Sequence, residues 1–215
     1  MTLEERPVRG VVFDQDGTLV NTFIPAMHAY SAASGREITL AELEPVAHLG
    51  AARNLVSALL GREATDRDDE VFHDALAREV SQVEPYDGIV ALLTALRGAG
   101  IATAVATNSD GRSASIVLGA HGLDRLMDTV VTVDLVGGTP KPAPDSIELA
   151  MARLGLAPGE VLFVGDSNAD MLAARAAGVR AVAAGWGHQS PTIEPENDDV
   201  WLDEPGEVLG LVRAG

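Results

Sequence analysis

Short apolar runs recur along the chain and alternate with helical patterns. The runs are rich in β-branched residues and occupy residues 11–13, 101–106, 130–133, 161–164 and 179–183. Runs of this kind are typical of strands that are covered on both faces, as in parallel sheets. The segments between them carry apolar residues at helical spacing, at 87–98, 109–120, 144–154 and 169–177. The alternation therefore predicts an α/β fold with a Rossmann-like parallel sheet between helices.

Residues 20–84 break this alternation, because they hold helical patterns and no convincing strand. The patterns occupy residues 22–33, 39–48, 51–60 and 68–83, and a capping box of Thr39 and Glu42 begins the second. We predict a discontinuous core and an inserted helical cap domain after the first strand. The core covers residues 1–19 and 85–215, and the cap covers residues 20–84. A last short strand is predicted at 200–202.

The composition limits the possible partners. The chain has 215 residues, 47% of them hydrophobic, and a formal net charge of −17, which disfavours nucleic acid and anionic lipid surfaces. The absence of cysteine excludes disulfides, thiolate metal sites and cysteine nucleophiles. No segment approaches the roughly 20 apolar residues of a membrane span, and the charged N-terminus does not resemble a secretory signal. We expect a cytoplasmic protein, either monomer or homodimer, with no nucleic-acid or membrane partner.

Polar residues follow four of the predicted strands. They are Asp14 and Asp16 after the first strand, Thr107, Asn108 and Ser109 after the second, Lys141 after the third, and Asp166 and Asp170 after the fourth. Ligands of open parallel sheets bind beyond the carboxyl ends of the strands. We therefore expect these side chains to form one site.

The chemistry of this set favours a metal and a phosphoryl group. Two carboxylates about 4 Å apart repel each other by roughly 4 kcal/mol at an effective dielectric constant near 20, and a divalent cation removes that cost. Ligands that are all oxygen atoms favour Mg²⁺. Lys141 offers a positive charge to phosphate oxygens, and Thr107 and Ser109 offer hydroxyl donors. A small phosphorylated metabolite is the expected partner.

Four motifs carry a family resemblance that spans nearly the whole chain. FDQDGTL, TNS, KPAP and GDSNAD, in this order, resemble the motifs of the haloacid dehalogenase superfamily. The helical insert resembles the phosphoglycolate phosphatase and β-phosphoglucomutase branch of that superfamily. The resemblance implies a phosphoric monoester hydrolase that is similar to phosphoglycolate phosphatase.

The resemblance also implies roles for individual residues. Asp14 corresponds to the nucleophile that forms an aspartyl-phosphate, and Asp16 to the general acid and base. Thr107 and Lys141 correspond to the residues that hold the transferring phosphoryl group. Asn108 either contacts the substrate or shapes its loop.

A magnesium site is implied by the same motifs. The ion is expected to be held by the Asp14 carboxylate, the Asp16 backbone carbonyl and Asp166. Asp170 is expected to support metal-bound water or Lys141.

Several alternatives stay open at this point. A phosphomutase of the β-phosphoglucomutase kind would use the same residues, and only its products would differ. A phospho-accepting or ligand-binding module without turnover is the non-enzymatic alternative. A dehalogenase is disfavoured because that branch lacks the second aspartate. The substrate, the oligomeric state and the pathway do not follow from the sequence.

Other polar and aromatic residues have weaker signals. We interpret Ser109 mainly as the N-cap of its helix, and expect the scattered histidines at 28, 48, 73, 121 and 188 to lie on the surface or at helix ends. His48 and Arg53 could reach the non-phosphate part of a substrate. Trp186 could border the site or simply pack. Asn21 departs from the acidic residue that is frequent there in relatives, so its role is open.

Overall fold

Six parallel strands form a single sheet. The computed structural model describes residues 7–196 and 199–212, apart from the side chain of His48. The strands lie in the order β3-β2-β1-β4-β5-β6, and every neighbouring pair is parallel. Their bounds are β1 Gly10–Phe13, β2 Ala102–Ala106, β3 Thr129–Val131, β4 Val161–Gly165, β5 Arg180–Ala184 and β6 Val200–Leu202. The predicted α/β fold is confirmed, including its short last strand.

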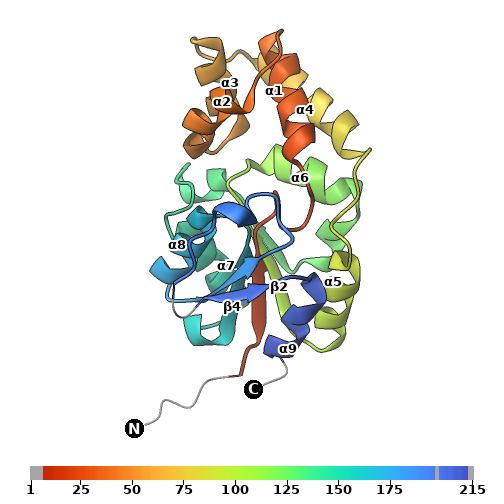
Figure 1. The fold of residues 1–215 in the computed structure, drawn as a ribbon, viewed down its shortest axis with the longest axis vertical. Coiled ribbons are helices and arrows are strands. Elements are labelled where there is room, and N and C mark those ends of the chain that lie inside the picture. Colours follow the sequence, from red (N-terminus) through yellow and green to blue (C-terminus); the bar gives the residue numbers. More distant parts are fainter. Residues whose placement is uncertain (1–6, 197–198, 213–215) are drawn as a thin grey trace.

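Successive residues of the strands face two different apolar cores, one on each side of the sheet. Val11 and Phe13 of β1 belong to one core, and Val12 belongs to the other. The helices that cover the Val12 face are α7 Asp145–Leu154 and α8 Asn168–Ala176, whereas α5 Ile89–Gly98, α6 Gly111–Ala120 and α9 Val208–Val212 contribute to the opposite core (Figure 1). Burial on both faces explains why the strands appear in the sequence as continuous apolar runs.

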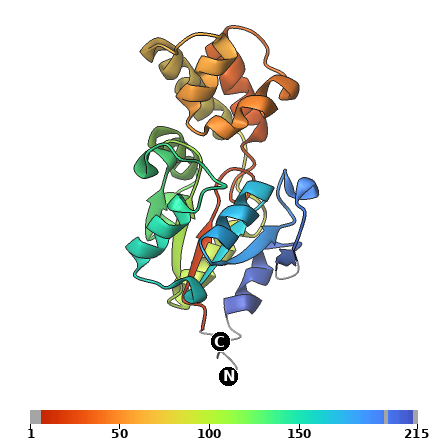
Figure 2. The same cartoon turned by 90° about the vertical axis from the view of Figure 1, so that its left-hand side faces the viewer.

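The helices between β1 and α5 lie together beyond the carboxyl ends of the strands (Figures 1 and 2). They are α1 Phe23–Ser34, α2 Leu40–Leu43, α3 Ala52–Leu60 and α4 Asp66–Val80, with a 3₁₀ helix, η1, at Glu44–Leu49. α1 packs against α4, and α4 packs against α6 below it. The apolar core of these helices is continuous with the core on one face of the sheet.

Two segments of the chain connect these helices to the sheet, and they lie side by side. Val20 forms a β-bridge with Pro85, and the backbone N–H of Tyr86 donates to the carbonyl of Leu19 at 3.1 Å. These residues fall in the segments where the sequence predicts the connections. The division into a core and a cap domain at residues 19/20 and 84/85 stays a prediction.

The predicted helical segment at 39–48 is helical throughout, but its second half is a 3₁₀ helix. The capping box is present, with the backbone N–H of Thr39 donating to Glu42 Oε2 at 3.0 Å, but the α-helix ends at Leu43 and continues as η1. Pro45 explains the change, because proline has no N–H to donate to the preceding turn. The fourth helix begins at Asp66 rather than Asp68, because Thr65 caps it.

Candidate active site

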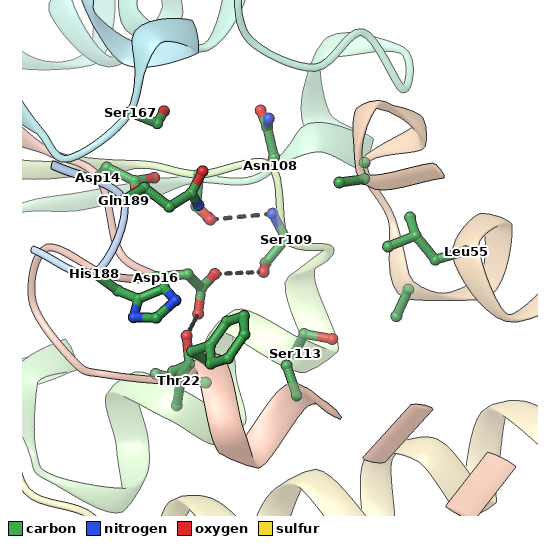
Figure 3. Close-up of a pocket in the computed structure, with 18 of the residues that line it drawn as sticks. Asp14, Asp16, Thr22, Leu55, Asn108, Ser109, Ser113, Ser167, His188 and Gln189 are labelled. Atoms are coloured by element: carbon green, nitrogen blue, oxygen red, sulfur yellow. Dashed lines mark hydrogen bonds between the residues drawn. The ribbon is translucent and has the colours of Figure 1, made fainter. Parts of the chain in front are cut away.

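One cavity lies at the carboxyl ends of β1, β2 and β4, beneath the helices α1–α4. The sheet order reverses between β1 and β4, which is where open parallel sheets bind their ligands. Figure 3 shows the side chains around this cavity. Its volume is about 260 Å³. Its lining includes every predicted site residue: Asp14, Asp16, Thr107, Asn108, Ser109, Lys141, Asp166 and Asp170. The structure therefore brings together residues that are spread over more than 150 positions of the sequence.

Lys141 is the buried positive charge of this cavity. Its Nζ atom lies 2.5 Å from Asp14 Oδ1 and 2.6 Å from Asp170 Oδ1, and it donates to the carbonyl of Ala106 at 3.0 Å. Burial alone would lower the pKa of the Lys141 ammonium, but the two carboxylates raise it above its ordinary value. Lys141 therefore stays charged and fixes Asp14 at the end of β1.

Three buried carboxylates form an acidic cluster beside this lysine. Oxygen atoms of Asp14, Asp166 and Asp170 all lie within 4.8 Å of one another. Burial, together with the neighbouring aspartates, raises the pKa of Asp14 well above its ordinary value, although Lys141 opposes that shift. Burial and then Asp170 raise the pKa of Asp166 to about 7. The charge of Lys141 therefore does not fully offset the burial and mutual repulsion of these carboxylates.

The donor set of the cluster fits a hard divalent cation. Asp166 Oδ2 accepts a hydrogen bond from the backbone N–H of Gln189 at 2.9 Å, whereas Asp166 Oδ1 is buried and has no partner. The three aspartates offer only oxygen ligands, and one of those oxygens has no partner. Oxygen ligands suit Mg²⁺, whereas zinc sites are typically built from nitrogen and sulfur ligands. The Asp16 carboxylate is not part of this cluster, and the expected Asp16 ligand is its backbone carbonyl.

Asp16 has a different environment from Asp14. Its carboxylate accepts hydrogen bonds from the hydroxyls of Thr22 and Ser109, both at 2.7 Å (Figure 3). It also accepts one from the Gln15 amide at 3.1 Å. Asp14 is paired with a cation, while Asp16 is held by neutral donors. Two aspartates one residue apart thus have the separate surroundings that separate roles require.

The interpretation of Ser109 as a helix N-cap is wrong. The N-cap of α6 is Asp110, whose side chain accepts from the backbone N–H of Ser113 at 2.9 Å. Ser109 donates its hydroxyl to Asp16 instead, so it belongs to the site. The distance of 93 residues between the two partners hides this contact from local sequence patterns.

Thr107 and Asn108 shape the loop after β2. The buried Thr107 Oγ1 accepts from the backbone N–H of Ser109 at 3.0 Å. The Asn108 side chain accepts from the backbone N–H of Lys141 at 2.7 Å and donates to its carbonyl at 3.4 Å. These contacts favour the loop-shaping alternative for Asn108, which holds the Lys141 loop against the end of β2.

Two glycines allow the backbone to approach Asp166 closely. Gly17 has a φ of +91°, and a Cβ atom there would lie 2.3 Å from Asp166 Oδ2. A Cβ atom at Gly187 would lie 2.1 Å from the Cβ of Asp166. Gly17 belongs to the FDQDGTL motif, so the sequence indicates that it lies at the site. No motif contains Gly187 or Gln189. Their position directly after the fifth strand is the one signal that could have identified them.

The histidines differ in their surroundings. His73 is buried, which corrects the expected surface position: its Nδ1–H donates to the carbonyl of Asp69 at 2.8 Å, and Nε2 lies 3.2 Å from Ser113 Oγ and 3.5 Å from Asp110 Oδ1. Burial lowers the pKa of His73, but these acidic neighbours raise it above its ordinary value overall. His73 therefore links α4 to α6.

The remaining histidine positions are mixed. His28 is exposed and pairs with Glu79, and His121 is the C-cap of α6, both as predicted. His188 is exposed, as predicted, but it also lines the cavity and stacks on Phe23 with ring centroids 4.0 Å apart, a contact that the sequence does not indicate. The side chain of His48 lies outside the described part of the chain.

The other weak candidates are not among the residues that line the cavity. Arg53 pairs with Asp66 at 3.0 Å and donates to the carbonyl of Ala64 at 2.9 Å. The Trp186 Nε1–H donates to the carbonyl of Thr18 at 3.0 Å, and the ring packs on the core. Asn21 is exposed, and its side chain accepts from the backbone N–H of Phe23 at 3.4 Å.

The sequence is similar to known proteins over nearly its whole length. The family model for haloacid dehalogenase-like hydrolases matches residues 11–184. The N-acetylmuramic acid 6-phosphate phosphatase of Pseudomonas aeruginosa is 31% identical over 215 residues, with 95% of each chain covered. A phosphoglycolate phosphatase of Xanthomonas campestris is 31% identical over 209 residues, covering 93% of this chain and 94% of its own.

The fold itself is found in solved structures. The crystal structure of CbbY from Rhodobacter sphaeroides in complex with phosphate superimposes with a TM-score of 0.82. It is 21% identical and covers 95% of this chain and 99% of its own chain. The likeness therefore includes the helices beyond the strand ends as well as the sheet.

Proposed function

The chain belongs to the haloacid dehalogenase-like hydrolase family and is a phosphatase of that family, and we propose that it hydrolyses a small phosphomonoester with Mg²⁺ through an aspartyl-phosphate. The observation that carries this proposal is the buried pair of Asp14 and Lys141 inside a cluster of carboxylates at the switch point of the sheet. A carboxylate held by a cation at this position is suited to attack phosphorus, because phosphoryl transfer depends mainly on positioning and charge.

In the first step, an oxygen of the Asp14 carboxylate attacks phosphorus, and the bond from phosphorus to the ester oxygen breaks. Asp16 gives its proton to the departing oxygen. In the second step, Asp16 takes a proton from water, the water oxygen bonds to phosphorus, and inorganic phosphate leaves Asp14. The hydroxyls of Thr22 and Ser109 support this assignment, since they orient the Asp16 carboxylate.

Lys141 and Thr107 are proposed to bind the phosphoryl group. The Lys141 ammonium offers its charge to the oxygens of that group, and the buried Thr107 hydroxyl stands at the end of β2. Asn108 contributes by fixing the Lys141 backbone.

Mg²⁺ is proposed to be held by Asp14, the Asp16 carbonyl and Asp166, with Asp170 in support. When bound, the ion supplies positive charge for the carboxylates and for the phosphoryl oxygens. The unpartnered Asp166 Oδ1 is the observation that supports this set.

Residues 20–84 are proposed to act as a cap over the catalytic core of residues 1–19 and 85–215. Closure of such a cap would exclude water from the phosphoryl site. Across residues 7–196 and 199–212, no helix has the length and apolar character needed to cross a membrane. A small phosphorylated metabolite is the proposed partner, and the protein is proposed to act as a monomer or homodimer.

A phosphate-release assay tests the proposal. Purified protein with Mg²⁺ should release inorganic phosphate from some members of a phosphomonoester panel, and a chelator or the Asp14→Asn substitution should abolish the release. Isomerised sugar phosphate without free phosphate would instead support a phosphomutase. Full activity in Asp14→Asn would contradict the assignment of the nucleophile.

A further inference from the structure

One wall of the cavity, contributed by the helices beyond the strand ends, is apolar. It is formed by side chains from α1, α3 and α4, namely Phe23, Tyr30, Leu55, Phe72 and Leu76. Leu55 projects from α3 towards the cavity, on the side opposite Asp16 (Figure 3). A substrate whose phosphoryl group lies at Asp14 therefore places the rest of the molecule against hydrophobic and aromatic surface.

None of the five side chains named for this wall carries a positive charge to offer a second anion. Among the described residues that line the cavity, Lys141 is the only lysine or arginine, and it is also the only lysine of the sequence. Its ammonium already lies between Asp14 and Asp170. Two arginines outside the lining are engaged in other ion pairs: Arg53 pairs with Asp66, and Arg112 pairs with Asp69 at 3.2 Å.

The balance of charge around the cavity also opposes a second anion. Four aspartates line it, and a bound phosphoryl group adds further negative charge. A carboxylate that is buried without a partner is far more costly than a buried hydroxyl or ring. A second anion on the substrate would be desolvated against the wall without compensation.

Resting on the proposed function, we propose that this enzyme selects phosphomonoesters whose leaving group is uncharged and presents apolar or aromatic surface. Substrates with a carboxylate or a second phosphate beyond the scissile bond are disfavoured. The names of two relatives, phosphoglycolate phosphatase and N-acetylmuramic acid 6-phosphate phosphatase, refer to substrates that carry a carboxylate. This chain therefore differs from those relatives in substrate class.

A matched pair of substrates tests the inference. Phenyl phosphate and para-carboxyphenyl phosphate differ in one carboxylate, and kcat/KM is measured for both with Mg²⁺. The native protein should prefer phenyl phosphate by at least about tenfold, the size of discrimination expected when one pocket contact is unfavourable. Equal rates, or a preference for the carboxylated ester, would overturn the inference while leaving the proposed phosphatase intact. Turnover of neither ester nor any other phosphomonoester would overturn both.

Substitutions in the wall provide a second measurement. Leu55→Arg should shift the ratio of kcat/KM towards the carboxylated ester by at least about tenfold. Leu55→Met keeps the wall uncharged and should keep the native ratio. Leu43→Arg, at a less buried position of the lining, is the second charged variant and should shift the ratio in the same direction. An unchanged ratio in folded Leu55→Arg and Leu43→Arg would overturn the inference.

Discussion

Replacing Lys141 with methionine tests whether the buried cation balances the acidic cluster. Methionine has a similar length and no charge, so the main loss is the ammonium that lies 2.5 Å from Asp14 and 2.6 Å from Asp170. The lysine side chain is 3% exposed, so water cannot replace it. The variant leaves three buried carboxylates within 4.8 Å of one another without their positive partner.

The expected cost follows from the burial of this pair. Removing one partner of a buried ion pair lowers the free energy of unfolding by about 3–5 kcal/mol. The pKa values of Asp14 and Asp166 are already raised by burial and by neighbouring carboxylates, that of Asp166 to about 7. Ionising these two carboxyls therefore lowers the free energy of unfolding once the pH rises above the unfolded carboxyl pKa of about 3.9. Lowering the pH protonates them and restores that free energy. The loss in free energy of unfolding caused by Lys141→Met should be largest above about pH 7 and should become smaller towards about pH 5.

Urea unfolding with a chelator present measures this deficit across the pH range. Arg112→Met is the matched control, because it removes an exposed ion pair with Asp69 that should be worth only about 0–1 kcal/mol. Adding Mg²⁺ should restore part of the stability of Lys141→Met, since an ion that binds only the folded state stabilises it. If Lys141→Met is as stable as the control above about pH 7, the argument from burial is refuted.

Three further predictions concern positioning and pH. Ser109→Ala should lower kcat about fivefold, equivalent to one hydrogen bond of about 1 kcal/mol to the general acid, and unchanged steady-state kinetics would contradict this. Gly187→Ala should raise the Mg²⁺ concentration needed for half-maximal activity, because the new Cβ atom displaces Asp166, whereas Gly159→Ala, which meets nothing within 4 Å, should not. His73→Gln should reduce the free energy of unfolding by about 1 kcal/mol near pH 6 and by less near pH 8. Acidic neighbours outweigh burial and raise the folded pKa of this histidine, so its contribution is present below the unfolded value and lost as the pH rises through the folded one; thermal melts with equal losses at both pH values would contradict it.

Much of the fold and the site could be predicted because burial and strand ends leave local signals. Strands covered on both faces appear as continuous apolar runs. The predicted bounds of the six strands therefore lie within a few residues of the observed ones. The residues of the site follow those strands directly, and parallel strands bring their carboxyl ends to one edge. The sequence therefore predicts that Asp14, Lys141 and Asp166 lie together.

The contacts that could not be predicted depend on the third dimension. Ser109 meets Asp16 across 93 positions, and His73 is buried only because α4 packs against α6. Local sequence patterns instead predict a helix cap for Ser109 and a surface position for His73. The apolar residues around Leu55 have a helical spacing that is usually typical of core packing, and nothing in the sequence shows that one side of this stripe borders the cavity.

The central claim is that Asp14 is the nucleophile, and its phosphorylation is the most direct measurement. The Asp16→Asn variant should be mixed with Mg²⁺ and para-nitrophenyl phosphate, whose leaving group needs no proton, and then quenched rapidly in acid. Because the variant lacks the base that activates water, the aspartyl-phosphate should accumulate. Mass spectrometry should find one phosphoryl group on the peptide that contains Asp14. A phosphoryl group on any other residue, or none while phosphate is released at the native rate, would contradict the account.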